Sequence, residues 1–227
     1  MNTSGKYLML KQLSILSSLN DEEINQLASA STYMQYKKGD TIYNYGDTTK
    51  GVYILDKGSV KLANTASCGK TLIKDIVYDG DIFGENIFTN EVVRKNYAEA
   101  ATVVKLFIIP MEVFKGLVMS NPAFAKMIMD VIIQRIQLLD QRMQNFVFKK
   151  AKARIVDFIM STGKSRGIKI GMDECLINHG MSHKEIAYLT DTSRQTVARV
   201  LGELKKENVI HFSTRKPGKI LIRNFQH

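Results

Sequence analysis

Arg194, Gln195 and Arg199 lie close together in a short amphipathic stretch near the C-terminus. On a helical wheel they fall opposite the apolar side chains of that stretch, which would face a core. Those apolar residues are Val197, Val200, Leu201 and Leu204. Arginine can donate two hydrogen bonds to the O6/N7 edge of guanine, and glutamine can form a paired contact with adenine in the major groove. The spacing therefore predicts a helix that reads bases in double-stranded DNA.

The residues before this stretch predict the other half of a helix-turn-helix. Ser182, with Glu185 three positions later, is typical of the capped start of a short first helix. Asp191 and Thr192 then predict a tight polar turn, and Ser193 can cap the second helix. On its own the arginine pair would fit an ordinary charged surface helix, so the capped first helix and the turn are what favour DNA.

The charge distribution agrees with a surface that binds phosphate. Residues 149–227 carry 16 Lys/Arg against 7 Asp/Glu, a net of +9, whereas residues 1–148 carry 16 against 15, a net of +1. Residues 209–212 and 219–223 predict two short strands joined by a turn at 213–218, which would complete a winged helix. The residues expected to bind phosphates, and so to set register without reading sequence, are Ser182, Lys184, Ser193, Thr196 and Lys219.

Composition limits the other function classes. The chain has 227 residues, 44% of them hydrophobic, which suits one domain of ordinary size and a smaller one. No stretch approaches the roughly 18 apolar residues of a membrane span, and no signal-peptide core is seen, so we expect a cytoplasmic protein. Cys68 and Cys175 fall in separate proposed domains, which argues against a disulfide framework; pairing between subunits or a lone reactive thiol stays open.

The middle of the chain has a sequence pattern typical of an antiparallel β-sandwich or β-barrel. Between about Tyr36 and Pro110, short apolar or alternating runs are separated by glycines at regular intervals. The expected strands are 41–43, 52–55, 59–63, 72–77 and 103–109. Ahead of them, residues 21–29 predict a helix capped by Asn20.

The longest helical signal runs from Pro122 to about Phe148, with Asn121 as its cap. Its apolar residues follow a heptad spacing on one face: Ala125, Met129, Ile132, Ile136, Leu139, Met143 and Phe146. A second face, with Phe124, Met127, Ile128, Val131 and Leu138, is expected to pack on the barrel. A helix that is apolar on two faces needs two partners, and a coiled coil with a second copy of itself supplies one. The alternative is a helix fully buried within one chain.

These motifs identify the chain as similar to the CRP/FNR family of bacterial transcription regulators over nearly its full length. The resemblance lies in the glycine pattern that ends in Gly80-Asp81-Ile82-Phe83-Gly84-Glu85, in Asn121-Pro122, and in the stretch from Ser193 to Arg199. It implies an α+β fold with an antiparallel, jelly-roll-like β-roll in residues 1–120, a dimerisation helix in 121–148 and a winged helix-turn-helix in 149–227. It also implies a homodimer that binds double-stranded DNA and contacts RNA polymerase.

The base-reading positions of the family match Arg194 and Arg199, and Gln195 stands where cyclic-AMP-binding members have glutamate. In the sensor half, cyclic-nucleotide-binding members run from Gly-Glu to an Arg-Ser/Thr pair. Gly84, Glu85 and Arg94 fit this pattern, but Lys95 replaces the hydroxyl residue. The resemblance places Leu139 and Asp140 where those members have a threonine and a serine near the adenine. An aliphatic side chain cannot supply that hydrogen bond, so cyclic AMP is not expected in the usual mode.

The effector itself stays open at this level. An organic acid or a phosphorylated metabolite could be held by Arg94 and Lys95, and haem could bind through Cys68, a methionine or an unusual ligand. A redox role for Cys68 is less expected than a plain surface thiol. No cofactor or metal is assigned. The resemblance fits an activator or a repressor of transcription.

An enzyme is the main alternative, because similar β-barrels host small-molecule-binding and metal-dependent catalytic sites. Such sites need two or more histidines with a carboxylate inside the barrel. All four histidines lie beyond residue 148, and the same shortage removes Ser/His and Cys/His nucleophilic pairs from the barrel. We therefore do not expect an enzyme.

Overall fold

The computed structural model describes residues 2–67, 69, 71–84, 93–170, 172–178, 181–212 and 219–223. The chain divides into two compact units, Met1–Ile136 and Gln137–His227, and the boundary falls inside the long helix α4 (Pro122–Phe148). Cys68, Glu85 and the turn expected at 213–218 lie outside the described residues. Within the described ranges no single helix has the length and hydropathy of a membrane span; α3 (Met111–Ser120) and α4, bent by 111°, meet those criteria only as a pair.

The first unit begins with helices that cover one face of a sheet. These are α1 (Thr3–Lys11), the short 3-10 helix η1 (Ser14–Leu16) and α2 (Asp21–Ala30). Asn20 caps α2 as predicted: its side chain accepts a hydrogen bond from the Glu23 N–H, and the Glu23 carboxylate accepts one from the Asn20 N–H. This reciprocal pair satisfies two backbone donors and fixes where the helix begins.

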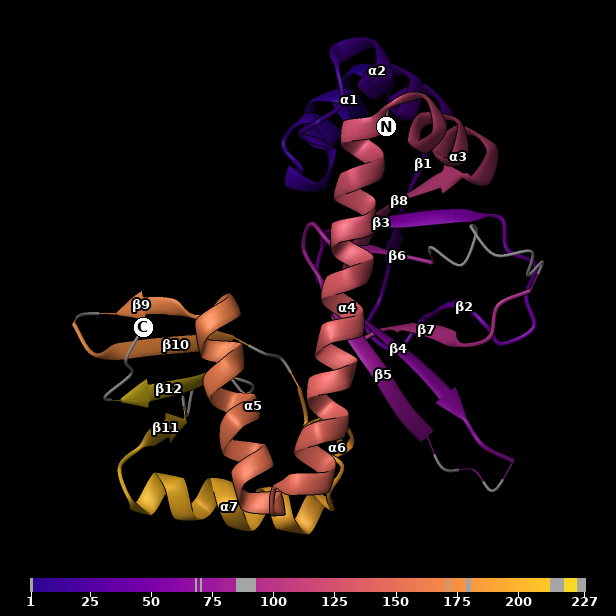
Figure 1. The fold of residues 1–227 in the computed structure, drawn as a ribbon. Helices are drawn as coiled ribbons and strands as arrows, with labels where there is room; N and C mark the ends of the chain where they lie inside the picture. The colour runs from indigo at the N-terminus through magenta and orange to yellow at the C-terminus, as the bar shows by residue number, and fades with distance from the viewer. Residues whose placement is uncertain are drawn as a thin grey trace. The chain divides into compact units, whose positions relative to one another are not determined.

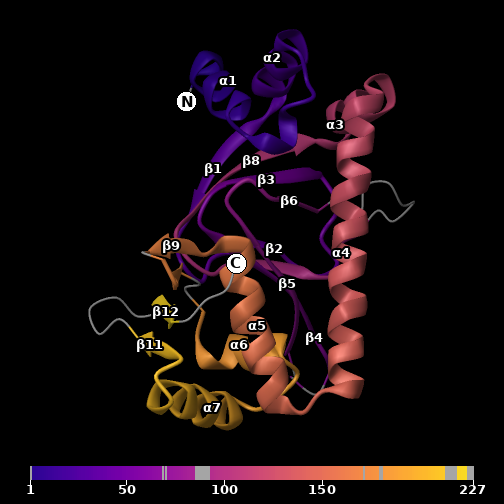
Figure 2. The ribbon, with the colours of Figure 1, turned by 60° about the vertical axis from the view of Figure 1, so that its left-hand side comes forward.

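Two four-stranded antiparallel sheets form the β-roll (Figures 1 and 2). One has the order β1-β8-β3-β6, with β1 (Thr32–Tyr36), β3 (Gly51–Lys57), β6 (Ile82–Phe83) and β8 (Val104–Pro110). The other has the order β2-β7-β4-β5, with β2 (Thr41–Tyr43), β4 (Ser59–Thr65), β5 (Thr71–Tyr78) and β7 (Tyr97–Ala100). The predicted fold class, α+β with an antiparallel β-roll, is confirmed.

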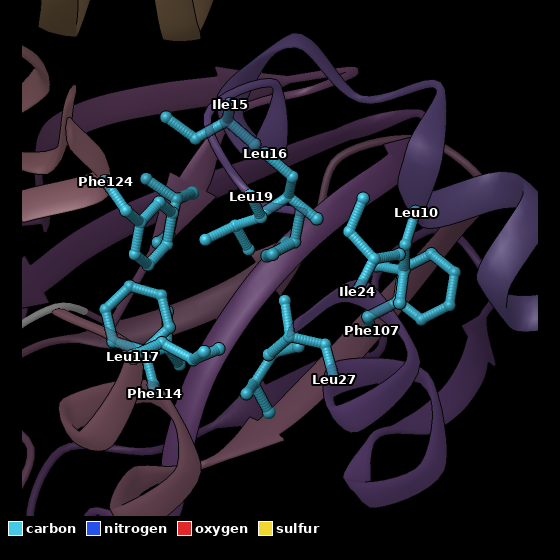
Figure 3. Packing of buried hydrophobic residues seen from close by; sticks show 14 of the residues in the cluster. Leu10, Ile15, Leu16, Leu19, Ile24, Leu27, Phe107, Phe114, Leu117 and Phe124 are labelled. Carbon is cyan, nitrogen blue, oxygen red and sulfur yellow. The ribbon is translucent and has the colours of Figure 1, made fainter. Parts of the chain in front are cut away.

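Strand β3 explains how one sheet serves two cores. Successive side chains of a strand point to opposite faces. Val52 and Ile54 belong to the cluster under the helices, whereas Tyr53 and Leu55 belong to the cluster between the two sheets. Both faces of β3 are buried, so its sequence is a continuous apolar run. Figure 3 shows the cluster under the helices, in which α3 and α4 contribute neighbouring aromatic rings.

Helix α4 begins at Pro122, as predicted, because Asn121 caps it: the Asn121 side-chain oxygen accepts a hydrogen bond from the Phe124 N–H at 3.0 Å. Phe124 and Ile128 are buried in the first unit, and the Phe124 ring lies 5.6 Å from the Phe114 ring. Leu138 does not pack as predicted, since it is 69% exposed. It lies beyond Ile136, where the first unit ends, so the apolar face extends further along α4 than that unit's core.

The second unit is the predicted winged helix. Its elements are α5 (Ala151–Arg166), β9 (Ile168–Ile170), β10 (Glu174–Asn178), α6 (His183–Leu189), α7 (Arg194–Lys206), β11 (Ile210–Phe212) and β12 (Lys219–Arg223). The sheet has the order β11-β12-β10-β9 and every pair is antiparallel. Helices α6 and α7 follow each other along the chain and pack together as the two helices of a helix-turn-helix.

Gly167 and Cys175 pack so closely that a side chain at residue 167 has no space. A Cβ on Gly167 would lie 2.0 Å from the Cys175 Sγ and 2.4 Å from the Gly163 carbonyl oxygen. Cys175 is a free thiol with no exposed surface, and burial raises its pKa. The thiol thus fills the space between α5 and β10 and is not available for chemistry.

We expect Gly167→Ala to destabilise the second unit by on the order of 3 kcal/mol, because the backbone carbonyl cannot move aside as a side chain would. Gly202→Ala, inside α7, is the matched control: nothing lies within 4 Å of its Cβ position, and a helical alanine should add about 0.5–1 kcal/mol. Thermal and denaturant unfolding of both variants measures the difference. Equal stabilities would contradict the packing described for Gly167.

Candidate nucleic-acid interface

Helix α7 has one buried face and one exposed face, as its sequence predicts. Val197, Val200, Leu201 and Leu204 are at most 5% exposed and seat the helix in the second unit. Arg194, Gln195 and Arg199 are exposed on the other side. Helix α7 packs against α5, α6 and β11, which fix the position of the helix that carries the exposed side chains. The base-reading role of these side chains stays a prediction.

The caps of the two helices lie where the sequence predicts them. The Ser182 hydroxyl donates to the Glu185 carboxylate at 2.8 Å, and that carboxylate also accepts from the Ser182 N–H at 2.7 Å. The Ser193 hydroxyl accepts from the Thr196 N–H at 3.1 Å. Both serines are exposed; the Glu185 carboxylate already lies at the start of α6, whereas the first turn of α7 presents a positive dipole end to solvent. Such a terminus suits a phosphate oxygen.

The other residues expected to bind phosphate are also at the surface. Lys184 is exposed, with its Nζ 5.9 Å from the centre of the Tyr188 ring. Thr196 and Lys219 are half-buried. Lys219 begins β12, and residues 213–218 before it lie outside the described residues. Their phosphate contacts stay predictions.

Arg199 belongs to a network that sequence reasoning missed. Its Nη1 donates to Glu203, one turn along α7, and Lys152 of α5 lies 3.1 Å from the other oxygen of the same carboxylate. The hydrogen bond from Lys152 holds the pKa of Glu203 below its usual range, so the carboxylate is ionised at neutral pH. The ion pair with Glu203 is made through Nη1 of the exposed Arg199 side chain, and a guanidinium has further N–H donors of the kind that can pair with guanine.

In the β-roll, the structure brings Gly84 and Arg94 together. Arg94 is 2% exposed, and its guanidinium donates to the Gly84 carbonyl at 2.9 Å and to the Gly51 carbonyl at 2.6 Å. The guanidinium carbon lies 4.5 Å from the centre of the Tyr43 ring and 5.3 Å from that of the Tyr53 ring. Arg94 therefore binds backbone and aromatic rings inside the β-roll rather than facing solvent.

The turn at Gly84 is shaped by this arginine. Gly84 has φ +80°, and a Cβ there would lie 2.8 Å from the Arg94 Nη1 and 2.9 Å from the Tyr53 ring. Both the backbone conformation and the close approach thus require glycine. Lys95, next along the chain, is exposed, whereas Leu139 and Asp140 are exposed on the part of α4 that belongs to the second unit. The six predicted effector residues are therefore divided between the two units, with Glu85 outside the described residues.

We expect Arg94→Met to lower the free energy of unfolding of the first unit by about 2–4 kcal/mol, since it leaves two buried carbonyls without a donor. Arg94→Lys keeps the charge but cannot match the planar fork that reaches both carbonyls, so it should lose a similar amount. Denaturant unfolding followed by tyrosine fluorescence measures both. Wild-type stability in Arg94→Met would contradict a structural role for this guanidinium.

The predicted seam of α4 is largely uncovered in a single chain. Met129, Ile136, Leu139, Met143 and Phe146 are 54–62% exposed, whereas Ile132 and Ala125 are half-buried. Ile132 packs against the core of the first unit. An exposed apolar stripe of this length is rarely left in water by a folded protein.

Within the described residues, no three His, Cys, Asp or Glu side chains are grouped so as to hold a metal ion.

The chain matches the cyclic nucleotide-binding domain family over residues 33–121 and the Crp-like helix-turn-helix domain family over residues 153–227. The Global nitrogen regulator of Synechococcus elongatus is 28% identical over 178 residues, which cover 78% of this chain and 80% of that protein.

Two further comparisons cover more of the chain. The Cyclic AMP receptor protein of Thermus thermophilus is 25% identical over 214 residues, or 94% of both proteins. The solved structure of FixK2 from Bradyrhizobium japonicum matches with a TM-score of 0.75 at 20% identity, and covers 86% of this chain and 94% of that one.

Proposed function

Because this chain belongs to the CRP/FNR family of transcription regulators, we propose that two copies of it bind one pseudo-palindromic DNA site. Each copy reads a half-site with Arg194, Gln195 and Arg199. One observation carries the proposal: these three side chains are exposed on α7 opposite a fully buried face. Residues 149–227 supply a net charge of +9 for the phosphates on either side, with Lys184 and Lys219 among the anchors.

The second copy is proposed to pair along α4. The exposed stripe that includes Ile136 and Met143 has heptad spacing, and its partner of matching shape is the same stripe of another chain. A two-fold axis between the helices would place the two α7 helices to read half-sites about 34 Å apart, one turn of DNA. The proposed domains are accordingly a β-roll sensor in residues 1–120, a dimerisation helix in 121–148 and a DNA-binding winged helix in 149–227.

The sensor half is proposed to respond to a ligand other than cyclic AMP held in the usual mode. The Thermus relative is named for cyclic AMP, but Lys95, Leu139 and Asp140 replace the hydroxyl groups that the usual mode needs. An anionic effector that reaches Arg94 would have to compete with the carbonyls of Gly51 and Gly84. As a DNA-bound regulator the protein would act in the cytoplasm together with RNA polymerase, and no enzymatic activity is proposed.

In-vitro selection from a random duplex pool tests the proposal. The full-length protein is used with and without a small-molecule extract of cells. We expect enriched sequences with two inverted half-sites and guanine at positions read by the arginines. Enrichment of a single unpaired motif would overturn the symmetric dimer, and absence of any enrichment under both conditions would overturn sequence-specific binding.

A further inference from the structure

Two arginines hold the turn of the helix-turn-helix from outside it. Arg142, in the last turns of α4, donates from Nε and Nη2 to the two carboxylate oxygens of Asp191 at 3.0 and 2.8 Å. Its Nη2 also donates to the Tyr188 carbonyl at 2.6 Å. The pair is bidentate and its side chains are only 21% and 26% exposed, so it is better shielded than a typical surface ion pair.

Arg154 of α5 binds the same turn through its backbone. Its Nε donates to the Thr190 carbonyl at 2.8 Å and its Nη2 to the Asp191 carbonyl at 2.7 Å. Its Nη1 donates to the Lys149 carbonyl at 2.7 Å, just past the end of α4. One guanidinium therefore joins the C-terminal ends of α4 and α6, where the helix dipoles favour a cation.

The turn needs support of this kind. Asp191 has φ +50°, a left-handed conformation that costs energy for a residue other than glycine, although aspartate and asparagine tolerate it best. Its backbone also fixes the step between α6 and α7. Within the described residues, Asp191 is clamped by its side chain and by its carbonyl at the same time. Both interactions come from helices outside the helix-turn-helix, α4 for the side chain and α5 for the carbonyl.

The same clamp touches the proposed dimer seam. The guanidinium carbon of Arg154 lies 5.3 Å from the centre of the Phe146 ring, and Phe146 is a seam residue. Arg142 directly precedes Met143, another seam residue. A partner helix that packs against these two side chains would therefore fix the α4 turns from which the clamp is built.

We propose that Arg142 and Arg154 are positioning residues for DNA recognition, which lock the turn at Asp191 to the last turns of α4. The recognition helix α7 then follows the dimer helix as one body, and the distance between half-sites is set at the seam. This inference rests on the proposed function. Arg142, Arg154 and Asp191 are not expected to contact DNA, yet they would control which half-site spacing the dimer accepts.

Spacing preference is the readout that a merely stabilising ion pair would not change. Inserting or removing one base pair between half-sites rotates one against the other by about 35° and moves it by about 3.4 Å. A dimer with a locked turn should lose at least about tenfold in affinity on such a duplex. With the lock removed, the loss should shrink to about threefold, while binding to an isolated half-site stays within about twofold of wild type.

The variants are chosen to spare the backbone. Asp191→Asn keeps the left-handed tolerance and the shape but removes the charge, and Asp191→Gly keeps the conformation alone. Arg142→Gln removes the other partner, and Arg142→Lys should restore part of the preference. Asp157→Asn is the matched control, because it breaks a 2.6 Å ion pair with Lys149 in the same unit without touching the turn.

Fluorescence anisotropy with the selected site and its one-base-pair spacing variants decides the outcome. Relaxed spacing in Asp191→Asn, Asp191→Gly and Arg142→Gln, with no change in Asp157→Asn, supports the proposal. Unchanged spacing preference in folded variants overturns it and leaves the proposed function intact. A wild-type protein with no spacing preference would instead show that the symmetric dimer itself is wrong, and the clamp would fall with it.

Discussion

A protein with glutamate at both Ile136 and Met143 is expected to be a folded monomer that binds its DNA site at least about 100-fold more weakly than wild type. The two side chains are 60% and 62% exposed in the single chain, so the fold of each unit does not depend on them. Across a two-fold seam the substitutions would bury carboxylates next to each other. A monomer also loses the gain in affinity from two linked half-site contacts, typically a factor of 100–10,000.

Sedimentation equilibrium gives the oligomeric state of this variant, and anisotropy gives its affinity for one and for two half-sites. Met119→Glu serves as the control, since Met119 is an exposed apolar residue of α3 outside the proposed seam. It should remain a dimer with wild-type affinity. A seam variant that stays dimeric would place the interface elsewhere on the chain.

Removing either arginine of the exposed α7 face is expected to cost about 1–3 kcal/mol at the operator, or roughly a 5- to 150-fold loss of affinity. The loss should come with relaxed preference at one base pair in each half-site, because each guanidinium reads one guanine edge. Arg194→Ala and Arg199→Ala should relax different positions. Repeating the selection with each variant measures this directly.

Lys219→Ala provides the contrast for the arginine variants. A phosphate contact carries no sequence information, so this variant should weaken binding to every sequence alike. The slope of log binding constant against log salt concentration should also become shallower by about one. A base-selective effect of Lys219→Ala, or an unchanged selected motif in both arginine variants, would refute the division into reading and anchoring residues.

The elements that could be predicted from the sequence are those with strong local signals. Helix α4 begins and ends where its cap and periodicity indicate, and α6 and α7 follow their capping serines. Strands β2 and β12 have the predicted bounds. The helices begin where a capping side chain hydrogen-bonds to backbone a few residues away. In the other cases, the apolar pattern of the segment itself indicates which face is buried. A short stretch of sequence is therefore enough to predict these elements.

Elements without such signals were not predicted. Strand β1 has no buried residue, so its sequence lacks an apolar run, and it forms because β8 provides hydrogen-bond partners across the sheet. The apolar residues of helix α1, Tyr7 to Leu10, form one run without helical spacing, and the helix buries Leu10 together with Lys6, whose Nζ donates to the Ser31 carbonyl. Strand β9 is exposed along its length and forms a backbone pairing with β10. Tertiary pairing decides these cases.

The candidate site also has a part that could be predicted from the sequence and a part that could not. The exposed α7 face could be predicted because helical periodicity fixes which side chains point away from a core. The ion pairs that support it could not, since Arg142 and Asp191 are 49 residues apart and Lys152 and Glu203 belong to different helices. Arg94 matched a family pattern, but only the fold reveals that its guanidinium is bound to the carbonyls of Gly51 and Gly84.

Two α7 helices related by two-fold symmetry are expected to lie in the major groove of one DNA site. Ala198 is exposed on the reading face, so an iron chelate on Ala198→Cys, in a Cys68→Ser background, would cleave DNA next to each helix. Cys175 is buried and should not be labelled. On the selected site we expect two cleavage centres about one helical turn, or about 34 Å, apart. A single centre, or cleavage spread evenly along the duplex, would contradict symmetric binding by two recognition helices.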